Sequence, residues 1–358
     1  MAVYILNFLT IPIYNFLIRD RKKFVIVMTL QIFLILALRD TTVGMDLRNY
    51  AGGYEFISSL GFTDMLSRLR IISVAELVYP YAYESGYVVL CWIFGKLHFS
   101  FYFFLVLHAA FCMTSFGLFI YRYSRAPWLS FAMFCALGYF EYSFGILRQI
   151  LAICILLFAV PLIEKKKPIP FFLLVLLSFT IHRVAIVFAV LYLAYYITVT
   201  KLVYLINAAF WVVFTALSPF LFRFVIAKVL TLLDKEGYTA GSFEWSHRMT
   251  LLLAIAVIAF FTLDFASLKD KRNSIIAWGF LLIFPIQILG MNNDTFARMV
   301  FMYLIFVAVF VPNVIADYKK KPMLREIGGY TLWFVMFLWM VYQFHSSQIV
   351  PYEFIFAS

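Results

Sequence analysis

Long apolar segments occupy most of this sequence. Of its 358 residues, 65% are hydrophobic and only 13% are charged, which is more apolar surface than a water-soluble domain can bury. An apolar helix of about 20 residues spans a bilayer, so a chain of this length can cross it about eleven to thirteen times. We therefore predict an all-α polytopic membrane protein in which residues 1–358 form a single integral membrane domain.

Short basic clusters separate many of the apolar segments and predict the orientation of the chain. They lie at residues 19–23, 122–125, 165–167, 201, 269–272 and 319–325. The positive-inside rule places such clusters in the cytoplasm. The cytoplasmic side then carries 17 basic and 6 acidic residues, and the outer side carries 12 of each. Because the inner excess equals the net charge of +11, topology explains the charge, and we expect no nucleic-acid binding.

One apolar stretch, residues 86–97, conflicts with this topology if it crosses the membrane. A crossing would place some of the basic clusters outside, and 12 residues are too few for an ordinary span. We predict that this stretch is a re-entrant or short interfacial helix that enters from outside, with both termini outside. Residues 3–18 lack the features of a signal peptide, so we interpret them as a retained first span. The longest outer connections are residues 39–85 and 223–248.

The basic residues on the two sides differ in kind. The outer side carries 9 arginines and 3 lysines, whereas the inner side carries 6 arginines and 11 lysines. The planar fork of arginine suits two-point binding of phosphate or carboxylate. The outer face therefore predicts a site for an anionic ligand.

The first outer loop begins with closely spaced charges. Arg39, Asp46, Arg48 and Tyr50 follow the second span, and two nearby glycines make this stretch a poor helix and a candidate ligand-holding loop. Arg39 has an alternative role as a lipid anchor at the end of the span. The aromatic residues of the outer loops are either a surface for sugar rings or an interfacial belt.

Two carboxylates and one arginine near the outer side form a second set of candidates. Glu84 precedes the short stretch 86–97, where the helix dipole alone favours a carboxylate, and where it could also accept a proton from a sugar hydroxyl. Arg148 lies inside the apolar run that follows Glu141. Ionisable residues within spans usually face an interior or a water-filled cavity. The structural alternative is an ion pair between Arg148 and Glu141.

Further candidates lie in the second half of the chain. His182 and Arg183 interrupt an apolar run, and a neutral histidine acts either as a base or as a partner of a helix carbonyl. Asp294 and Arg298 precede a late span at the level of Arg148. Arginines from separate helices at one depth predict a clamp for a diphosphate.

Motifs for soluble donors and cofactors are missing from the sequence. The four cysteines lie in apolar segments, and we find no nucleotide-binding glycine loop, DxD-type metal motif or metal-ligand spacing. We therefore expect no cofactor, no metal and no sugar-nucleotide donor. If the protein is a transferase, its donor should be linked to a lipid and presented outside.

The order of these motifs resembles that of the EpsG-type branch of the Wzy-like polysaccharide polymerases. The resemblance runs nearly the whole chain, and Arg183 departs from the family pattern, which usually has a small or polar residue there. That departure leaves His182 either as a base or as part of a basic binding patch. The matching segments are Leu38-Arg39, Val43-Gly44-Met45-Asp46, Tyr50, Glu84-Ser85-Gly86-Tyr87, Arg148-Gln149 with Ala152, His182, Arg298 and Pro351-Tyr352.

This resemblance implies a GT-C-like glycosyltransferase in the bacterial cytoplasmic (inner) membrane, with its active site facing the periplasm or exterior. Such an enzyme transfers a glycan from undecaprenyl diphosphate to the non-reducing-end sugar of another lipid-linked repeat unit. The candidate bases are Asp46, Glu84 and His182. The residues expected to bind the diphosphate are Arg39, Arg148, Arg183 and Arg298. The residues expected to bind the glycan are Arg48, Tyr50, Glu141 and Asp294.

The implied partners are undecaprenyl-diphosphate-linked oligosaccharide repeat units, membrane lipids and, as a candidate, a chain-length regulator protein. The alternatives are a lipid-linked oligosaccharide flippase, an O-antigen ligase and a membrane O-acyltransferase. A flippase should show pseudo-symmetric halves, and a ligase usually has its longest outer loop late in the chain. Here the longest loop comes early. The identity of the sugar and the linkage lie beyond the sequence.

Overall fold

The structure is a computed structural model that describes residues 1–69, 83–226, 243–318, 322–345 and 347–356. Over these residues it is helical and contains no β-strand, apart from one antiparallel bridge between Arg39 and Phe354. The predicted all-α class is therefore confirmed.

The first half of the chain forms helices of very unequal length. They are α1 (Ala2–Leu17), α2 (Arg21–Ala37), α3 (Leu47–Ser59), α4 (Phe62–Ser67), α5 (Ser85–Lys96), α6 (Phe101–Tyr123), α7 (Pro127–Ala136), α8 (Tyr139–Tyr142), α9 (Leu147–Glu164) and α10 (Pro168–Ile181). The second half adds the 3₁₀ helix η1 (Arg183–Tyr195), α11 (Lys201–Leu221), the π-helical turn η2 (Phe222–Ile226), α13 (His247–Thr262), η4 (Phe265–Lys269), α14 (Lys271–Leu281), α15 (Ile283–Gly290), α16 (Asp294–Met299), α17 (Phe301–Ala316) and α18 (Pro322–Phe344).

Five helical stretches of the described chain are long and apolar enough to cross a membrane. They are α6, α9, α11 with the start of η2, α14 with α15, and α18, and six shorter apolar helices accompany them. Nearly all side chains of α7 and most of those of α9 and α17 are buried, whereas α11 and α18 expose most of theirs. A helix with exposed apolar side chains is stable next to lipid. The protein is thus a polytopic membrane protein, while the number of crossings stays a prediction.

One sequence-based expectation about local structure was wrong. Residues 47–59 form α3 in spite of Gly52 and Gly53. A Cβ at Gly53 would lie 2.5 Å from the ring of Tyr83, so this glycine allows α3 to pack closely, and the packing offsets its cost in the helix of about 1 kcal/mol.

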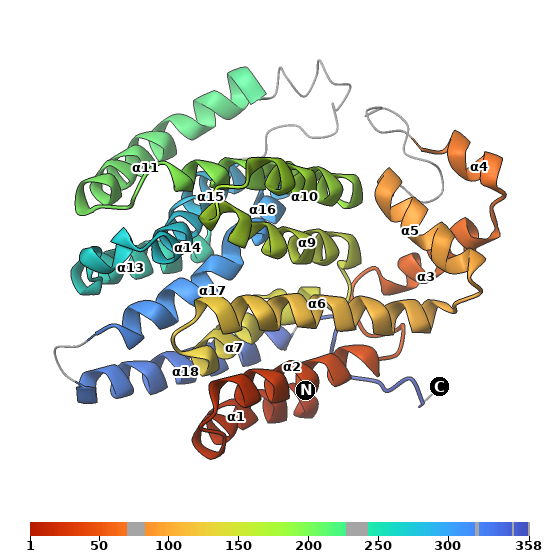
Figure 1. The fold of residues 1–358 in the computed structure, drawn as a ribbon, viewed down its shortest axis with the longest axis horizontal. Coiled ribbons are helices and arrows are strands. Elements are labelled where there is room, and N and C mark those ends of the chain that lie inside the picture. Colours follow the sequence, from red (N-terminus) through yellow and green to blue (C-terminus); the bar gives the residue numbers. More distant parts are fainter. Residues whose placement is uncertain (70–82, 227–242, 319–321, 346, 357–358) are drawn as a thin grey trace.

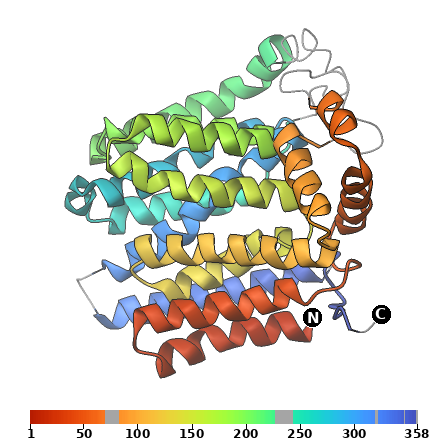
Figure 2. The ribbon, with the colours of Figure 1, turned by 45° about the vertical axis from the view of Figure 1, so that its right-hand side comes forward.

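The connections between helices gather at two ends of the bundle (Figure 1). At one end lie α3, α4 and α5 beside the start of α9, and both termini are drawn at this side in Figure 2. Here residues 348–354 lie along the loop after α2. The backbone N–H of Asp40 donates to Glu353, that of Gly44 donates to Gln348, and the Tyr4 hydroxyl donates to the carbonyl of Ile349.

At the opposite end the described basic clusters meet. Arg21 at the start of α2 donates to the carbonyl of Ser124 after α6, and Arg122 forms an ion pair with Glu164 at the end of α9. The clusters at residues 19–23, 122–125 and 269–272 therefore lie at the same end of the molecule as the end of α9. The side of the membrane that this end faces stays a prediction. The short helix α5 is neither one of the five membrane-length stretches nor one of the six shorter apolar helices. It lies at the other end of the bundle, with α3 and α4 (Figure 1).

Candidate active site

Three ionisable side chains from separate parts of the chain meet at the end where α9 begins. Glu84 precedes α5, Arg148 is the second residue of α9, and His182 separates α10 from η1. Nη1 of Arg148 forms a short ion pair with Oε2 of Glu84, and Nδ1 of His182 lies 3.1 Å from Oε1 of the same carboxylate. We call these residues, with Tyr50, the Glu84 cluster.

Close packing of α5 against the end of α10 brings Glu84 to His182. A Cβ at Gly86 would collide with the side chain of Thr180 and lie 2.8 Å from its carbonyl oxygen. Only glycine fits at this point of contact. The Glu-x-Gly spacing in the sequence therefore positions the carboxylate two residues before the tight approach.

Aromatic rings surround the guanidinium of Arg148. Its Nε donates to the hydroxyl of Tyr50 at 3.2 Å, and its Cζ lies 4.8 Å from the ring centre of Tyr83. The rings of Tyr50 and Tyr83 stack at 5.5 Å, and the buried ring of Tyr87 meets both edge-on. These contacts fix the orientation of the guanidinium plane, while 22% of the Arg148 side chain remains exposed.

The electrostatics of the cluster keep Glu84 ionised. Burial opposes its charge, but the hydrogen bond from His182 and the positive charge of Arg148 outweigh burial and lower the pKa of Glu84 to about 2. An ionised carboxylate only accepts hydrogen bonds, so Nδ1 of His182 carries the proton in this contact. In the neutral imidazole, Nε2 then keeps its lone pair and can accept a proton.

The structure connects Arg183 with the same carboxylate through its backbone. The N–H of Arg183 lies 3.3 Å from Oε1 of Glu84. This bond depends on the position of residue 183 and not on its side chain, so an unusual residue is tolerated there. Arg183 as a ligand for a diphosphate stays a prediction.

Arg39 lies apart from this cluster. It is 1% exposed, its guanidinium donates to the carbonyls of Leu36 and Ser143, and its Cζ lies 5.5 Å from the ring centre of Phe144. These contacts tie the end of α2 to the loop before α9. Arg39 is therefore neither an exposed lipid anchor nor a neighbour of Arg148.

Asp46 and Arg48 lie at the exposed start of α3. Asp46 has a left-handed backbone (φ 64°), and its carbonyl accepts the N–H of Tyr50, so it begins the helical turn that delivers Tyr50 to Arg148. Among the described residues, its carboxylate has no hydrogen-bond partner. Gly44 just before it also has a positive φ (128°), and a Cβ there would lie 2.5 Å from the carbonyl oxygen of Phe144. The catalytic role of Asp46 and the glycan-binding role of Arg48 stay predictions.

Glu141 does not pair with Arg148. Its carboxylate accepts a short hydrogen bond from Ser347, and burial raises its pKa. The alternative expectation, an ion pair between Arg148 and Glu141, is therefore wrong, because Arg148 pairs with Glu84 instead.

The second predicted arginine reaches the start of α9 through its backbone. The carbonyl of Arg298, on α16, accepts a hydrogen bond of 2.7 Å from the side chain of Gln149, and the Arg298 side chain is exposed. Asp294 begins α16, and its side chain lies outside the described part of the chain. The structure thus brings Arg298 to the neighbour of Arg148 but not into contact with Glu84.

The sequence analysis missed two residues near the candidate site, Tyr83 and Arg248. Tyr83 was treated only as one of many loop aromatics, although it stacks on Tyr50 and packs on Arg148. Arg248 on α13 is 5.2 Å from the ring centre of Phe301 and lies near Tyr142, as Arg298 does. The motif order held no signal for either, because both depend on which helices pack together.

No group of three or more His, Cys, Asp or Glu side chains capable of holding a metal occurs in the described part of the chain, and independence from metal stays a prediction.

No curated protein and no solved structure matches the sequence. A model of the EpsG family matches residues 22–354, which include every residue of the Glu84 cluster, and the chain therefore belongs to the EpsG family.

Proposed function

We propose that this protein is a polysaccharide polymerase of the bacterial cytoplasmic membrane. Its donor is a glycan on undecaprenyl diphosphate, and its acceptor is the non-reducing-end sugar of another lipid-linked repeat unit on the outer face. Family membership supports the broad activity. The donor, the acceptor and the orientation belong to the proposal.

The observation that carries the proposal is the convergence of Glu84, Arg148 and His182. A fixed guanidinium can stabilise a leaving diphosphate, and an imidazole held by an ionised carboxylate can serve as a base, so the cluster can support glycosyl transfer without a metal ion. The side chains of Arg148 and His182 remain 22% and 20% exposed, so a ligand can reach them.

In the proposed reaction, Nε2 of His182 takes the proton of the acceptor hydroxyl as its oxygen attacks the anomeric carbon of the donor. A glycosidic bond forms, and the bond between the anomeric carbon and the diphosphate oxygen breaks. Undecaprenyl diphosphate leaves with the bonding electrons. Arg148 stabilises the charge that develops on this leaving group, since preorganised donors are the largest single contribution in such sites.

Glu84 acts in this scheme as a positioning residue. A carboxylate with a pKa of about 2 is a poor base near neutral pH, so it orients the imidazole and the guanidinium. This assignment favours His182 over Glu84 as the base. Asp46, one helical turn before Tyr50, is the remaining candidate.

The surroundings suit a bulky anionic glycolipid. The stacked rings of Tyr50 and Tyr83 offer apolar faces on which a sugar can stack beside the charged groups. Arg298 and Arg248 both lie near Tyr142 and supply further positive charge, and the carbonyl of Arg298 contacts Gln149, the residue after Arg148. We propose these two arginines as the second part of the diphosphate site.

The test uses lipid-linked single repeat units extracted from cells that lack this protein. Purified protein in liposomes should convert them into a ladder of longer glycans in the presence of a chelator and without sugar nucleotide. A ladder that appears only after addition of divalent metal or sugar nucleotide contradicts the lipid-donor mechanism. Movement of unpolymerised units across the bilayer, without a new glycosidic bond, would identify a flippase.

A further inference from the structure

A second cluster of arginines lies at the opposite end of α9. At about 1.5 Å per residue, the 18 residues of this helix separate it from the Glu84 cluster by roughly 25 Å. Here Oε2 of Glu164 accepts from Nη2 of Arg122 at 2.9 Å and lies 3.7 Å from Nε of Arg272, while Tyr123 donates a short hydrogen bond to Oε1. We call these four residues the Glu164 cluster.

This cluster has more positive charge than its carboxylate neutralises. Arg21 stands beside it, held by the carbonyls of Tyr121 and Ser124, so three arginines surround one glutamate. Asp20 and Asp270 on the adjoining loops cap the N-termini of α2 and α14, and the basic residues of segments 19–23 and 269–272 outnumber these two carboxylates. The local charge is therefore positive.

Two of these arginines can accept a further anion. The Arg272 side chain is 50% exposed, and its 3.7 Å contact with Glu164 is longer than a hydrogen bond. The Arg122 side chain is 36% exposed and contacts Glu164 through Nη2. A phosphate oxygen is the acceptor that best suits paired guanidinium groups.

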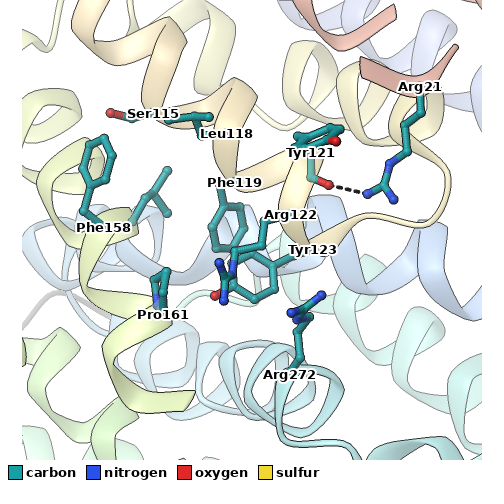
Figure 3. A pocket seen from close by; sticks show the side chains of 11 residues that line it. Arg21, Ser115, Leu118, Phe119, Tyr121, Arg122, Tyr123, Phe158, Pro161 and Arg272 are labelled. Carbon is teal, nitrogen blue, oxygen red and sulfur yellow. Dashed lines mark hydrogen bonds between the residues drawn. The ribbon is translucent and has the colours of Figure 1, made fainter. Parts of the chain in front are cut away.

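A cavity of about 490 Å³ opens beside the cluster (Figure 3). Its basic end carries Arg21, Arg122 and Arg272, and its other walls are apolar side chains of α6 and α9. Leu118 and Phe158 on these walls are exposed apolar residues in a chain that spans a membrane, so they face lipid. The cavity is therefore charged at one end and continuous with the bilayer interior along the other.

We propose that this cavity binds an anionic phospholipid, with its phosphate on Arg122 and Arg272 and an acyl chain along Leu118 and Phe158. Basic pockets between membrane helices on the side with excess positive charge are the usual setting for such headgroups. A soluble phosphate would leave the apolar walls unused, whereas a phospholipid matches both halves of the cavity. The site is separate from the proposed polymerase reaction and does not depend on it.

The test compares phosphatidylglycerol with phosphatidylcholine as probes. Purified protein in neutral detergent is titrated with each lipid, and bound lipid is counted by native mass spectrometry. We expect preferential binding of phosphatidylglycerol, weakened about fivefold by Arg272→Gln, since one basic residue near a headgroup contributes on the order of 1 kcal/mol. Arg272→Lys should retain most of the binding, and this second variant keeps the test informative if the first fails to fold.

The matched control is Lys165→Gln, which removes one exposed positive charge from the loop that follows Glu164. It should change binding by less than twofold. An equal loss in the control would indicate diffuse surface charge and would overturn the proposal. Equal binding of both lipids, or displacement of phosphatidylglycerol by millimolar inorganic phosphate, would overturn it as well.

Discussion

At each end of α9 a glutamate pairs with an arginine, but the surroundings of the two pairs differ. In the Glu84 cluster an arginine and a histidine share one carboxylate, and tyrosine rings pack on the arginine. In the Glu164 cluster two arginines and a tyrosine share the carboxylate, and no imidazole takes part among the described contacts. A carboxylate that holds arginine is thus compatible with two roles. The imidazole of His182 is what distinguishes the first end.

The largest expected effect comes from removing that imidazole. His182→Gln should lower the rate of polymerisation by about 10²–10⁴, the usual contribution of a positioned base. The rate is measured as ladder formation from lipid-linked repeat units, at equal amounts of folded protein. His345→Gln, which changes an exposed histidine, is the matched control and should be silent. A silent His182→Gln would move the role of base to Asp46.

The fork of Arg148 is the next test of the comparison. Arg148→Lys keeps the charge but loses two-point contact, and we expect a loss of roughly 10²–10³ in rate, as for removal of one donor from a comparable oxyanion site. Single repeat units should accumulate in cells while the amount of protein stays normal. The corresponding change at the other end, Arg122→Lys, should leave the rate within about threefold. Similar losses at both ends would erase the distinction between the clusters.

The ionisation of Glu84 predicts how stability depends on pH. Because its folded-state pKa lies near 2 and its ordinary value is 4.5, its contribution is fully present above about pH 4.5 and is lost as the pH falls through 2. That contribution is on the order of 3 kcal/mol. Wild type should therefore exceed Glu84→Gln in thermal stability at neutral pH, and the margin should shrink as the pH falls from about 4.5 towards 2. A margin that stays constant over this acid range would show that the ionised carboxylate does not contribute to stability.

The smallest effect is expected for the carboxylate at the other end. Glu164→Gln weakens contacts to two partly exposed arginines, and exposed ion pairs contribute only about 0–1 kcal/mol. We expect a decrease in melting temperature of a few degrees at most and less than a twofold change in polymerisation rate. Loss of polymer in this variant would show that the two ends of α9 are functionally coupled.

The sequence predicted the class of the protein and singled out Glu84, Arg148 and His182, which the structure brings together, because hydropathy and isolated polar residues are local signals. Hydropathy indicates spans, and Arg148 inside an apolar run or His182 between two apolar segments is conspicuous without any structure. What the sequence could not predict is pairing. Glu141 is close to Arg148 along the chain, yet Glu84, 64 residues away, is the partner because Gly86 brings α5 against α10.

Arg39 illustrates the opposite limit. By position it resembled a ligand-binding arginine at the end of a span, but its contacts are two backbone carbonyls and a phenylalanine ring. Burial of this kind follows from the packing of the α2 end on the loop before α9, which no local pattern encodes. For the same reason the Glu164 cluster was recognised only as a signal for topology.

The contacts between residues 348–354 and the loop after α2 have a consequence for biogenesis. Helices α1 and α2 enter the membrane early in synthesis, but Asp40 and Gly44 receive their backbone partners only when Glu353 and Gln348 have been translated. Bonds between segments about 300 residues apart form late. The loop that leads into Tyr50 therefore receives these partners only after residues 348–353 have been translated, so its backbone contacts form late in folding.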